Sequence, residues 1–248
     1  MAVGIDVPAG VTDWVSYLTT TWLGAYEYRG NGFFNSSTPY TQWAAGDLTN
    51  SAESGVILNG SFTYAPPGGF SGTLSSLEFG TNLSGSASAG YDISEVLRLD
   101  LSGATATTAF TYAIYFLSTQ GNLSYLWSYL SEQGTTQAGN DGAADTLYSF
   151  SGDDTLTGGT GADTFVFDAD YVGVTGDWGN DTITDFTDGV DKIKFVDLWL
   201  DYSDFTSDTS VTVSGNVITY VDSSTSTTNT ITLTGFAGTL DSSDFIFA

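Results

Sequence analysis

The sequence predicts an α+β domain followed by an all-β domain that winds as a parallel β-roll. In the first half of the chain, stretches with a helical spacing of apolar residues occur before and after stretches that read as strands. In the second half a nine-residue pattern repeats, which is typical of β-rolls. The polar stretch Ser131 to Asn140 separates the two halves. We therefore expect one domain at residues 1–134 and a second domain at residues 135–248.

Apolar spacing and capping residues give the expected elements of the first domain. Thr12 and Asp13 can cap a helix whose apolar residues recur at helical spacing, and Asn122 can cap a later helix. The expected elements, in order, are a helix at 12–22, an irregular aromatic-rich segment at 26–43, strands at 55–64, 71–79 and 91–101, and helices at 104–118 and 122–130.

The second domain is organised around a pattern of small residue, any residue, Asp, any residue, apolar residue. The first three Asp residues, Asp145, Asp154 and Asp163, are nine positions apart. Each apolar residue begins a short strand that faces the interior, and turns must stack because no turn can bury that residue alone. The pattern occurs in phase at 143–147, 152–156, 161–165 and 179–183, and one residue out of phase at 189–193.

This pattern indicates calcium binding in the turns. Ca²⁺ takes several oxygen ligands from carboxylates and backbone carbonyls. Gly lets the backbone turn sharply and present its carbonyls, and Asp is short enough to reach an ion from its own turn. Loops rich in Asp and Gly between ordinary strands are the alternative, but several units in phase favour calcium. The expected calcium ligands are Asp145, Gly152, Asp154, Gly159, Gly161, Asp163, Gly179, Asp181, Asp185, Asp188 and Asp191.

Asp residues two periods apart are expected on the same side of the roll. This places Asp145 beside Asp163, and Asp163 beside Asp181. Beyond the repeats, the sequence predicts a strand at 192–198, a hairpin of 211–213 with 217–221, a strand at 230–234 and a last strand at the C-terminus.

The repeat units resemble the RTX (repeats-in-toxin) calcium-binding block. The stretch from Gly161 to Phe195, which ends in GNDTITDFTDGVDKIKF, is similar to the β-roll domain that closes secreted serralysin-type RTX proteins. The ending LDSSDFIFA resembles the uncleaved export signal that type I transporters read in that group. The resemblance implies Ca²⁺ as a cofactor and the type I secretion machinery as a partner. It also implies a secreted protein, extracellular or associated with the cell surface.

Composition excludes several classes of protein. The net charge of −25 argues against binding to nucleic acid or anionic lipid, and it suits divalent cations. Without Cys or His there are no zinc sites, disulfides or His-based triads, so we do not expect an enzyme. The N-terminus lacks the features of a signal peptide, and no apolar run reaches the roughly 18 residues of a transmembrane segment. Repulsion among the carboxylates predicts that the second domain folds only with calcium.

Residues from Val11 to Gly134 resemble the HasA-type haem-acquisition (hemophore) family. The resemblance lies in VTDWVSYLTTTW, LNGSFTYAPPGGFSGTLSSLEFGTNLSG and YAIYFLSTQGNLSYLWSYLSEQG. It implies an antiparallel sheet with helices on one face, and carriage of one haem through a His and a Tyr, with a second His that supports the Tyr. Tyr64 matches the Tyr ligand, and a phenolate can ligate haem iron. Both family histidines are missing and the loop after Tyr64 is short, so a haem would depend on Tyr64 alone.

Three functions remain open. The first is a secreted, non-enzymatic calcium-binding protein that folds and associates with itself outside the cell, as a matrix, surface-layer or adhesion component. The second is a hemophore that holds one haem through Tyr64. The third is a module that binds a polysaccharide or an apolar surface through exposed aromatic residues. Aromatic residues from Tyr26 to Tyr40 could form a protein–protein contact, although core filling is the stronger expectation for them.

Overall fold

The computed structural model describes residues 2–36, 38–66, 69–168 and 177–248. The chain forms two compact units. The first unit contains the residues up to Ile5 and Trp14–Tyr129, and the second unit contains Asp6–Asp13 and Leu130–Ala248.

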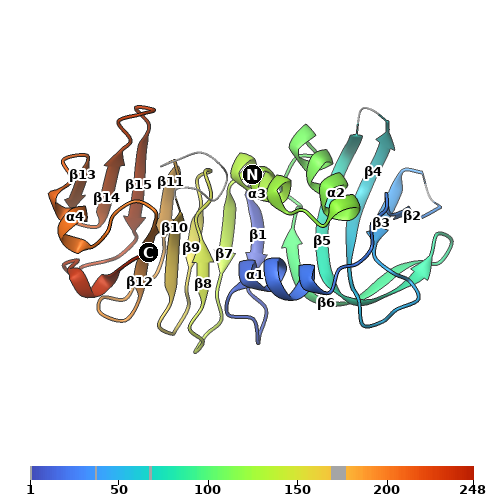
Figure 1. Cartoon of the computed structure of the whole chain (residues 1–248), viewed down its shortest axis with the longest axis horizontal. Helices are drawn as coiled ribbons and strands as arrows, with labels where there is room; N and C mark the ends of the chain where they lie inside the picture. The colour runs from blue at the N-terminus through green and yellow to red at the C-terminus, as the bar shows by residue number, and fades with distance from the viewer. Residues whose placement is uncertain (1, 37, 67–68, 169–176) are drawn as a thin grey trace. The chain divides into compact units, whose positions relative to one another are not determined.

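The first unit is an antiparallel sheet with short helices. Its strands follow the order β1-β6-β5-β4-β3-β2, and each neighbouring pair is antiparallel (Figure 1). The strands are β1 (Val3–Asp6), β2 (Phe33–Phe34), β3 (Tyr40–Ala45), β4 (Ser54–Ala65), β5 (Gly69–Ser86) and β6 (Gly90–Asp100). The helices are α1 (Trp14–Ser16), the π-helical η1 (Tyr17–Trp22), α2 (Thr108–Gln120) and α3 (Ser124–Gln133).

Local signals and aromatic packing hold these elements. The side chain of Thr107 accepts a hydrogen bond from the backbone N–H of Phe110 and caps α2, which ends at Gly121 with a positive φ of 61°. In the core, the ring of Trp22 stacks on Tyr26 at 4.5 Å and meets Phe79 edge-on at 5.1 Å. The core is therefore mainly aromatic around η1.

The second unit winds its strands into two parallel rows. One row contains β7 (Thr135–Ala138), β9 (Thr155–Thr157), β11 (Asn180–Ile183) and β15 (Thr228–Leu233), and continues antiparallel into β14 (Val217–Val221) and β13 (Val211–Ser214). The other row contains β8 (Thr146–Tyr148), β10 (Thr164–Asp168), β12 (Lys192–Val196) and β16 (Phe245–Phe247). Helix α4 (Tyr202–Ser207) and the 3₁₀ helix η2 (Ser242–Asp244) lie between later strands.

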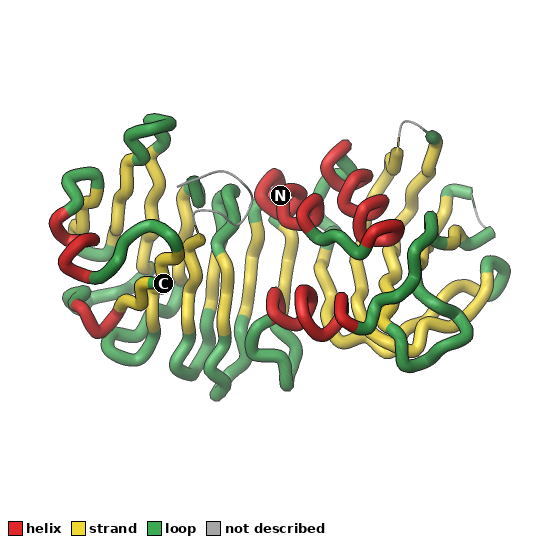
Figure 2. The backbone as a smooth tube through the Cα atoms, viewed as in Figure 1, coloured by secondary structure: helices red, strands yellow, loops and turns green. Residues whose placement is uncertain are grey.

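Consecutive strands from β7 to β12 alternate between the two rows, so the chain turns at alternate ends of the strands (Figure 2). The apolar residue that follows each repeat Asp by two positions points between the rows and is fully buried. These residues are Leu147, Leu156, Phe165, Ile183 and Ile193. The repeat pattern thus fixes both the turns and the interior of the roll.

Residues 6–13 form a layer of the second unit before its first repeat turn. Val7 donates its N–H to the carbonyl of Ala138 at 2.7 Å, and Thr146 donates its N–H to the carbonyl of Thr12 at 2.7 Å. The hydroxyl of Tyr148 lies 3.0 Å from Asp13 Oδ2. The strand β8, at the edge of its sheet, is therefore covered by this segment along part of its length.

The predicted fold class, an α+β domain followed by a separate all-β roll, is wrong. The strands belong to one mixed sheet of 12 strands and one parallel sheet of four, and only 18% of the chain is helical. The protein is therefore mostly β. One reason is the stretch Ser131 to Asn140, which is not a linker but contains the end of α3 and the strand β7. Gln137 of β7 is buried and hydrogen-bonded to the backbone of Tyr148, so apolar alternation does not reveal this strand.

Candidate metal centre

The turns of the second unit form two stacks, one at each end of the strands. We call the stack of turns 139–145, 158–163 and 184–191 the first turn edge. We call the stack of turns 149–154 and 178–179 the second turn edge. Because the pattern repeats every nine residues, successive repeat Asp residues lie at alternate turn edges.

At the first turn edge, three buried Asp residues form a column. Asp145 donates its backbone N–H to Asp163 Oδ1 at 2.9 Å, and Asp163 donates its N–H to Asp191 Oδ1 at 2.9 Å. The carboxylates of Asp163 and Asp191 thus each accept a hydrogen bond from the turn before them. In addition, Asp191 Oδ2 accepts from the N–H of Thr187 at 2.7 Å, and Asp145 Oδ2 accepts from the N–H of Asn140 at 2.5 Å.

Glycine permits the close stacking at this edge. A side chain at Gly161 would collide with the carbonyl oxygen of Ala143 in the turn before it. Gly159 has a positive φ of 89°, and the N–H groups of Gly158 and Gly159 donate to the two oxygens of Asp185 at 2.9 and 2.7 Å. Backbone and carboxylate oxygens therefore gather where three turns meet.

One carboxylate oxygen of this edge has no hydrogen-bond donor. Among the described residues, the buried side-chain atoms without a partner are Asp163 Oδ2 and Trp178 Nε1. Burial, and then the nearby carboxylates of Asp191, Asp145 and Asp185, raise the pKa of Asp163 to about 6. A buried anionic oxygen without a donor, in a negative surrounding, fits a hard cation.

The carboxylates alone do not form a metal cage. In the part of the chain that the structure describes, no group of three or more Asp or Glu residues is arranged to hold a metal ion. A cation at Asp163 would therefore also need backbone carbonyls, which are ordinary calcium ligands. The carbonyl oxygens of Ala143 and Gly158 lie against glycines of neighbouring turns, Gly161 and Gly139.

The two buried carboxylates of the second turn edge, Asp154 and Asp181, are fully engaged by protein donors. Asp154 Oδ1 accepts from the N–H and the hydroxyl of Thr135 at 2.5 and 2.7 Å, and Oδ2 accepts from the N–H of Phe150 at 2.6 Å. Asp181 Oδ1 accepts from the N–H of Asp154, and Oδ2 accepts from the hydroxyl of Ser149, both at 2.8 Å. Burial raises the pKa of Asp154 to about 6, and burial together with the charge of Asp154 raises the pKa of Asp181 well above its ordinary value.

The predicted neighbourhood of Asp145 and Asp163 is confirmed, but that of Asp163 and Asp181 is wrong. Strand β11 is the next described strand after β10, and the two strands lie in different rows. Asp163 and Asp181 are therefore at opposite turn edges, although they are two sequence periods apart. The partners are Asp163 with Asp191, and Asp154 with Asp181. The irregular unit between the two strands includes residues 169–176, which lie outside the described residues.

The remaining predicted ligands occupy different positions. Gly152 and Gly179 are at the second turn edge, where a side chain on Gly179 would collide with the carbonyl oxygen of Gly152. Asp188 is exposed, and its carboxylate lies close to Gly238. Gly152 and Gly179 thus have a packing role, and Asp188 belongs to a surface loop.

Sequence reasoning missed two fully buried polar residues of the roll, Asp244 and Asn229. Asp244 Oδ1 accepts from the N–H of Gly189 at 3.0 Å and extends the first turn edge by one layer. The repeat pattern is visible there, because Ser242, Asp244 and Ile246 follow the order small residue, Asp, apolar residue. Asn229 Oδ1 accepts from the N–H groups of Trp178 and Gly179 at 2.9 and 3.1 Å, and no sequence pattern marks it.

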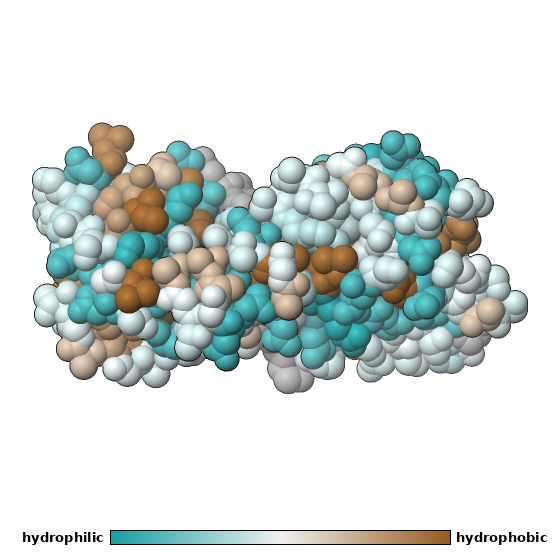
Figure 3. All heavy atoms as spheres, turned by 90° about the horizontal axis from the view of Figure 1, so that it is seen from below, coloured by the Kyte–Doolittle hydropathy of each residue, from teal (hydrophilic) through white to brown (hydrophobic). Residues whose placement is uncertain are grey.

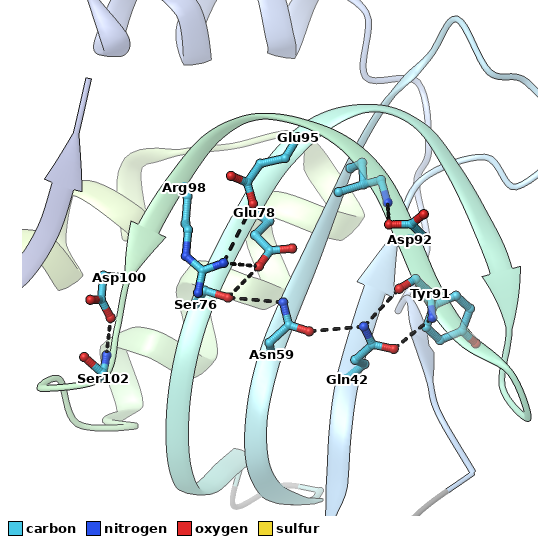
Figure 4. A network of polar contacts seen from close by, with 11 residues as sticks. Gln42, Asn59, Ser76, Glu78, Tyr91, Asp92, Glu95, Arg98, Asp100 and Ser102 are labelled. Carbon is cyan, nitrogen blue, oxygen red and sulfur yellow. Dashed lines mark hydrogen bonds and ion pairs between the residues drawn. The ribbon is translucent and has the colours of Figure 1, made fainter. Parts of the chain in front are cut away.

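The first unit contains a chain of polar side chains across β3 to β6 (Figure 4). Gln42 donates to Asn59 Oδ1, Asn59 donates to the hydroxyl of Ser76, and this hydroxyl donates to Glu78. Arg98 then pairs with Glu78 at 2.8 Å. Because each member is bonded to the next, this network of side chains holds the register of the strands.

Tyr64, the candidate haem ligand, lies within an aromatic cluster. Its ring stacks on Phe34 at 5.4 Å and packs against Phe70 at 5.0 Å, and 36% of the residue is exposed. The groove beside it, which Tyr115 also lines, has a volume of about 220 Å³. Small-molecule sites usually have volumes of about 300 to 1,000 Å³. Pro67 and Gly68, in the loop after Tyr64, lie outside the described residues.

The repeats identify the family of the chain. The sequence model of the family described as Peptidase M10 serralysin C terminal matches residues 120–247, more than half of the chain. The chain belongs to the serralysin C-terminal family. The matched region includes both turn edges and every strand from β7 to β16. No curated protein matches the chain.

Solved structures of hemophores are similar in part to this member of the serralysin C-terminal family. The apo and holo forms of the hemophore HasA from Yersinia pestis are each 21% identical to it, with a TM-score of 0.40. Each match covers 53% of this chain and 89% of the hemophore. A HasA mutant from Yersinia pseudotuberculosis gives the same values. A TM-score of 0.40 is too low to transfer a function.

Proposed function

We propose that this protein is a secreted, non-enzymatic calcium-binding protein, and that calcium completes the first turn edge of its second unit. The observation that carries the proposal is the buried Asp163 Oδ2, which accepts no hydrogen bond from the described residues. Asp145, Asp185 and Asp191 make the surroundings of this oxygen negative, and backbone carbonyls of the stacked turns would complete the oxygen ligands of the ion. When bound, calcium would supply the positive charge that these carboxylates lack.

Calcium titration by calorimetry tests this proposal. We expect the wild-type protein to bind calcium saturably, and Asp163→Asn to weaken the binding at least tenfold. Asp92→Asn is the matched control, because it removes the same charge from an exposed residue of the first unit and leaves binding unchanged. Absence of saturable calcium binding in the wild-type protein would refute the proposal.

We also propose export by a type I route to an extracellular or cell-surface location. Membership of the serralysin C-terminal family and the ending that resembles a type I export signal support this route. No described helix is long and apolar enough to cross a membrane. Expression beside a type I transporter should release the protein into the medium, and a variant without residues 240–248 should stay in the cells.

We further propose that the protein associates with itself outside the cell. The hairpin of β13 and β14 supports it, because the stretch Ser210 to Val221 carries no charge in a chain with a net charge of −25. Val213 on this hairpin is 45% exposed. Within the described residues, no strand pairs with the outer edge of β13. Uncharged edge strands are the usual sites of strand pairing between molecules.

Light scattering at high protein concentration tests self-association. In millimolar calcium we expect dimers or larger assemblies, and Val213→Lys should shift the population toward monomers. Thr219→Lys, on the inner strand of the same hairpin, adds the same charge away from the free edge. Monomers alone in the wild-type protein would exclude a role in a matrix or surface layer.

Haem carriage through Tyr64 is the alternative function, and titration with hemin decides it. The exposed phenol of Tyr64 favours this alternative. Its packing against Phe34 and the small volume of the groove, however, leave little room for a haem. A charge-transfer band that is lost in Tyr64→Phe would establish a hemophore. No saturable change in the spectrum would exclude one.

Binding of a polysaccharide or an apolar surface is the second alternative. The half-exposed rings of Tyr112 and Tyr115 on α2 favour it. On the face shown in Figure 3, however, hydrophobic residues occur in small groups separated by polar ones. Partition of the protein with polysaccharide beads or oil droplets distinguishes this function from the others.

A further inference from the structure

The two turn edges of the roll differ in how their buried carboxylates are satisfied. At the first turn edge, Asp163 keeps one oxygen without a donor. At the second turn edge, Asp154 and Asp181 together accept five hydrogen bonds, and each of their four oxygens has at least one donor. A carboxylate whose oxygens all accept hydrogen bonds from the protein has no need of a cation ligand.

Two hydroxyl groups are specific to the second turn edge. The hydroxyl of Thr135 donates to Asp154 at 2.7 Å, and that of Ser149 donates to Asp181 at 2.8 Å. The amide of buried Gln137 holds the hydroxyl of Thr135 in place with a hydrogen bond of 2.8 Å. At the first turn edge, the described contacts of Asp163 include no side-chain donor.

The other unpaired buried atom has the wrong polarity for a metal ligand. It is the indole Nε1 of Trp178, beside the second turn edge, and an indole N–H only donates. In the adjacent layer, the amide oxygen of Asn229 accepts from Trp178 and Gly179, so it is occupied as well. Neither group offers a free oxygen to a cation.

For the described residues, we infer that the second turn edge closes without calcium, and that calcium binds at the first turn edge alone. This inference rests on the proposed calcium binding, and it removes Gly152, Asp154, Gly179 and Asp181 from the expected ligands. The hydroxyl groups of Thr135 and Ser149 then satisfy the carboxylates of the second turn edge, and a divalent cation satisfies Asp163 at the first turn edge. Without calcium the turns 149–154 and 178–179 remain ordered.

Hydrogen exchange of the wild-type protein, with chelator and with calcium, tests the difference between the edges. In chelator we expect the amides of Phe150 and Asp154, which donate at the second turn edge, to be protected. The amides of Asp145 and Asp163 should exchange rapidly until calcium is added. The inference is overturned if all four amides gain protection together on addition of calcium.

Counting bound calcium by equilibrium dialysis and metal analysis gives a second test. We expect Asp181→Asn and Ser149→Ala to bind as many ions as the wild-type protein, and Asp163→Asn to bind fewer. Loss of an ion in Ser149→Ala or Asp181→Asn would place calcium at the second turn edge and overturn the inference. Absence of calcium from the wild-type protein would instead overturn the proposed function, so the two failures are distinguishable. If Asp181→Asn does not fold, Ser149→Ala and the exchange experiment still decide.

Discussion

At the residue scale, a repeat Asp is first a structural residue. Asp163 and Asp191 each receive a backbone N–H from the turn before, so their carboxylates tie two layers together before any metal is considered. Asp145 instead accepts from Asn140 within its own turn. The charge of these buried groups is costly, and this cost is what a cation can remove. One side chain thus links the stacking of turns to the binding of an ion.

Gly161 should tolerate no side chain. In Gly161→Ala the new Cβ would collide with the carbonyl oxygen of Ala143, and a backbone atom cannot move aside cheaply. We expect a lower melting temperature of the calcium-loaded protein, which thermal circular dichroism measures. Gly24→Ala is the control, because nothing lies within 4 Å of its Cβ and Ala is the better helix former by about 1 kcal/mol. Equal melting temperatures for both variants would contradict the stacking.

The raised pKa values of Asp154 and Asp163 predict that acid stabilises the calcium-free second unit. Both values rise from 3.8 to about 6, so the folded state binds protons more tightly than the unfolded state. The resulting stabilisation is complete below pH 3.8 and is lost as pH rises through about 6.

Urea unfolding in chelator at about pH 7 and about pH 5 measures this effect. The midpoint should be higher at the lower pH. In calcium the trend should weaken or reverse, because protons compete with the ion for Asp163. A midpoint in chelator that does not depend on pH would show that these carboxyls are not buried as described.

At the scale of single elements, the short strands of the roll are stable only as a stack. Strand β9 has three residues, and only Leu156 of these is buried. Such a strand has little stability of its own and depends on the layers on either side.

Leu156→Ala should therefore destabilise the whole second unit. Removing a fully buried Leu costs about 2 to 5 kcal/mol, depending on how far the cavity collapses. Chemical denaturation in calcium measures the loss. Thr157→Ala is the control, because this neighbouring side chain is half-buried and should cost under about 1 kcal/mol. If both changes cost the same, Leu156 is not part of a tightly packed interior.

Elements with a strong periodic signal could be predicted from the sequence, and those held by single polar contacts could not. The strands β8 to β10 follow from the repeat, and β4 and α2 follow from their apolar spacing. Strand β7 has a polar sequence and is fixed by contacts of Gln137 with Tyr148, which are distant in sequence. At the candidate site, likewise, the nine-residue period predicts which Asp residues take part. It does not predict at which turn edge each of them lies.

At the scale of the whole molecule, the two units should respond differently to calcium. The second unit contains the repeat turns, whereas the first unit contains the aromatic core around Trp22. In differential scanning calorimetry we expect two transitions, of which calcium raises only one. Calcium at about 100 times its Kd adds about 2.7 kcal/mol for one site, which corresponds to several degrees in Tm. A single transition that moves as a whole would contradict separate units.

The layer formed by residues 6–13 has a consequence for the order of synthesis. The amide of Asn140 donates to the carbonyl of Pro8 across 132 positions of sequence. At the usual rate of translation, roughly ten seconds pass between the emergence of the two partners. During that interval residues 6–13 have to remain unpaired, so this layer of the roll cannot form until residues 138–146 have been made. Pairing of residues 6–13 with another nascent chain during that interval is therefore a route to misfolding that this topology opens.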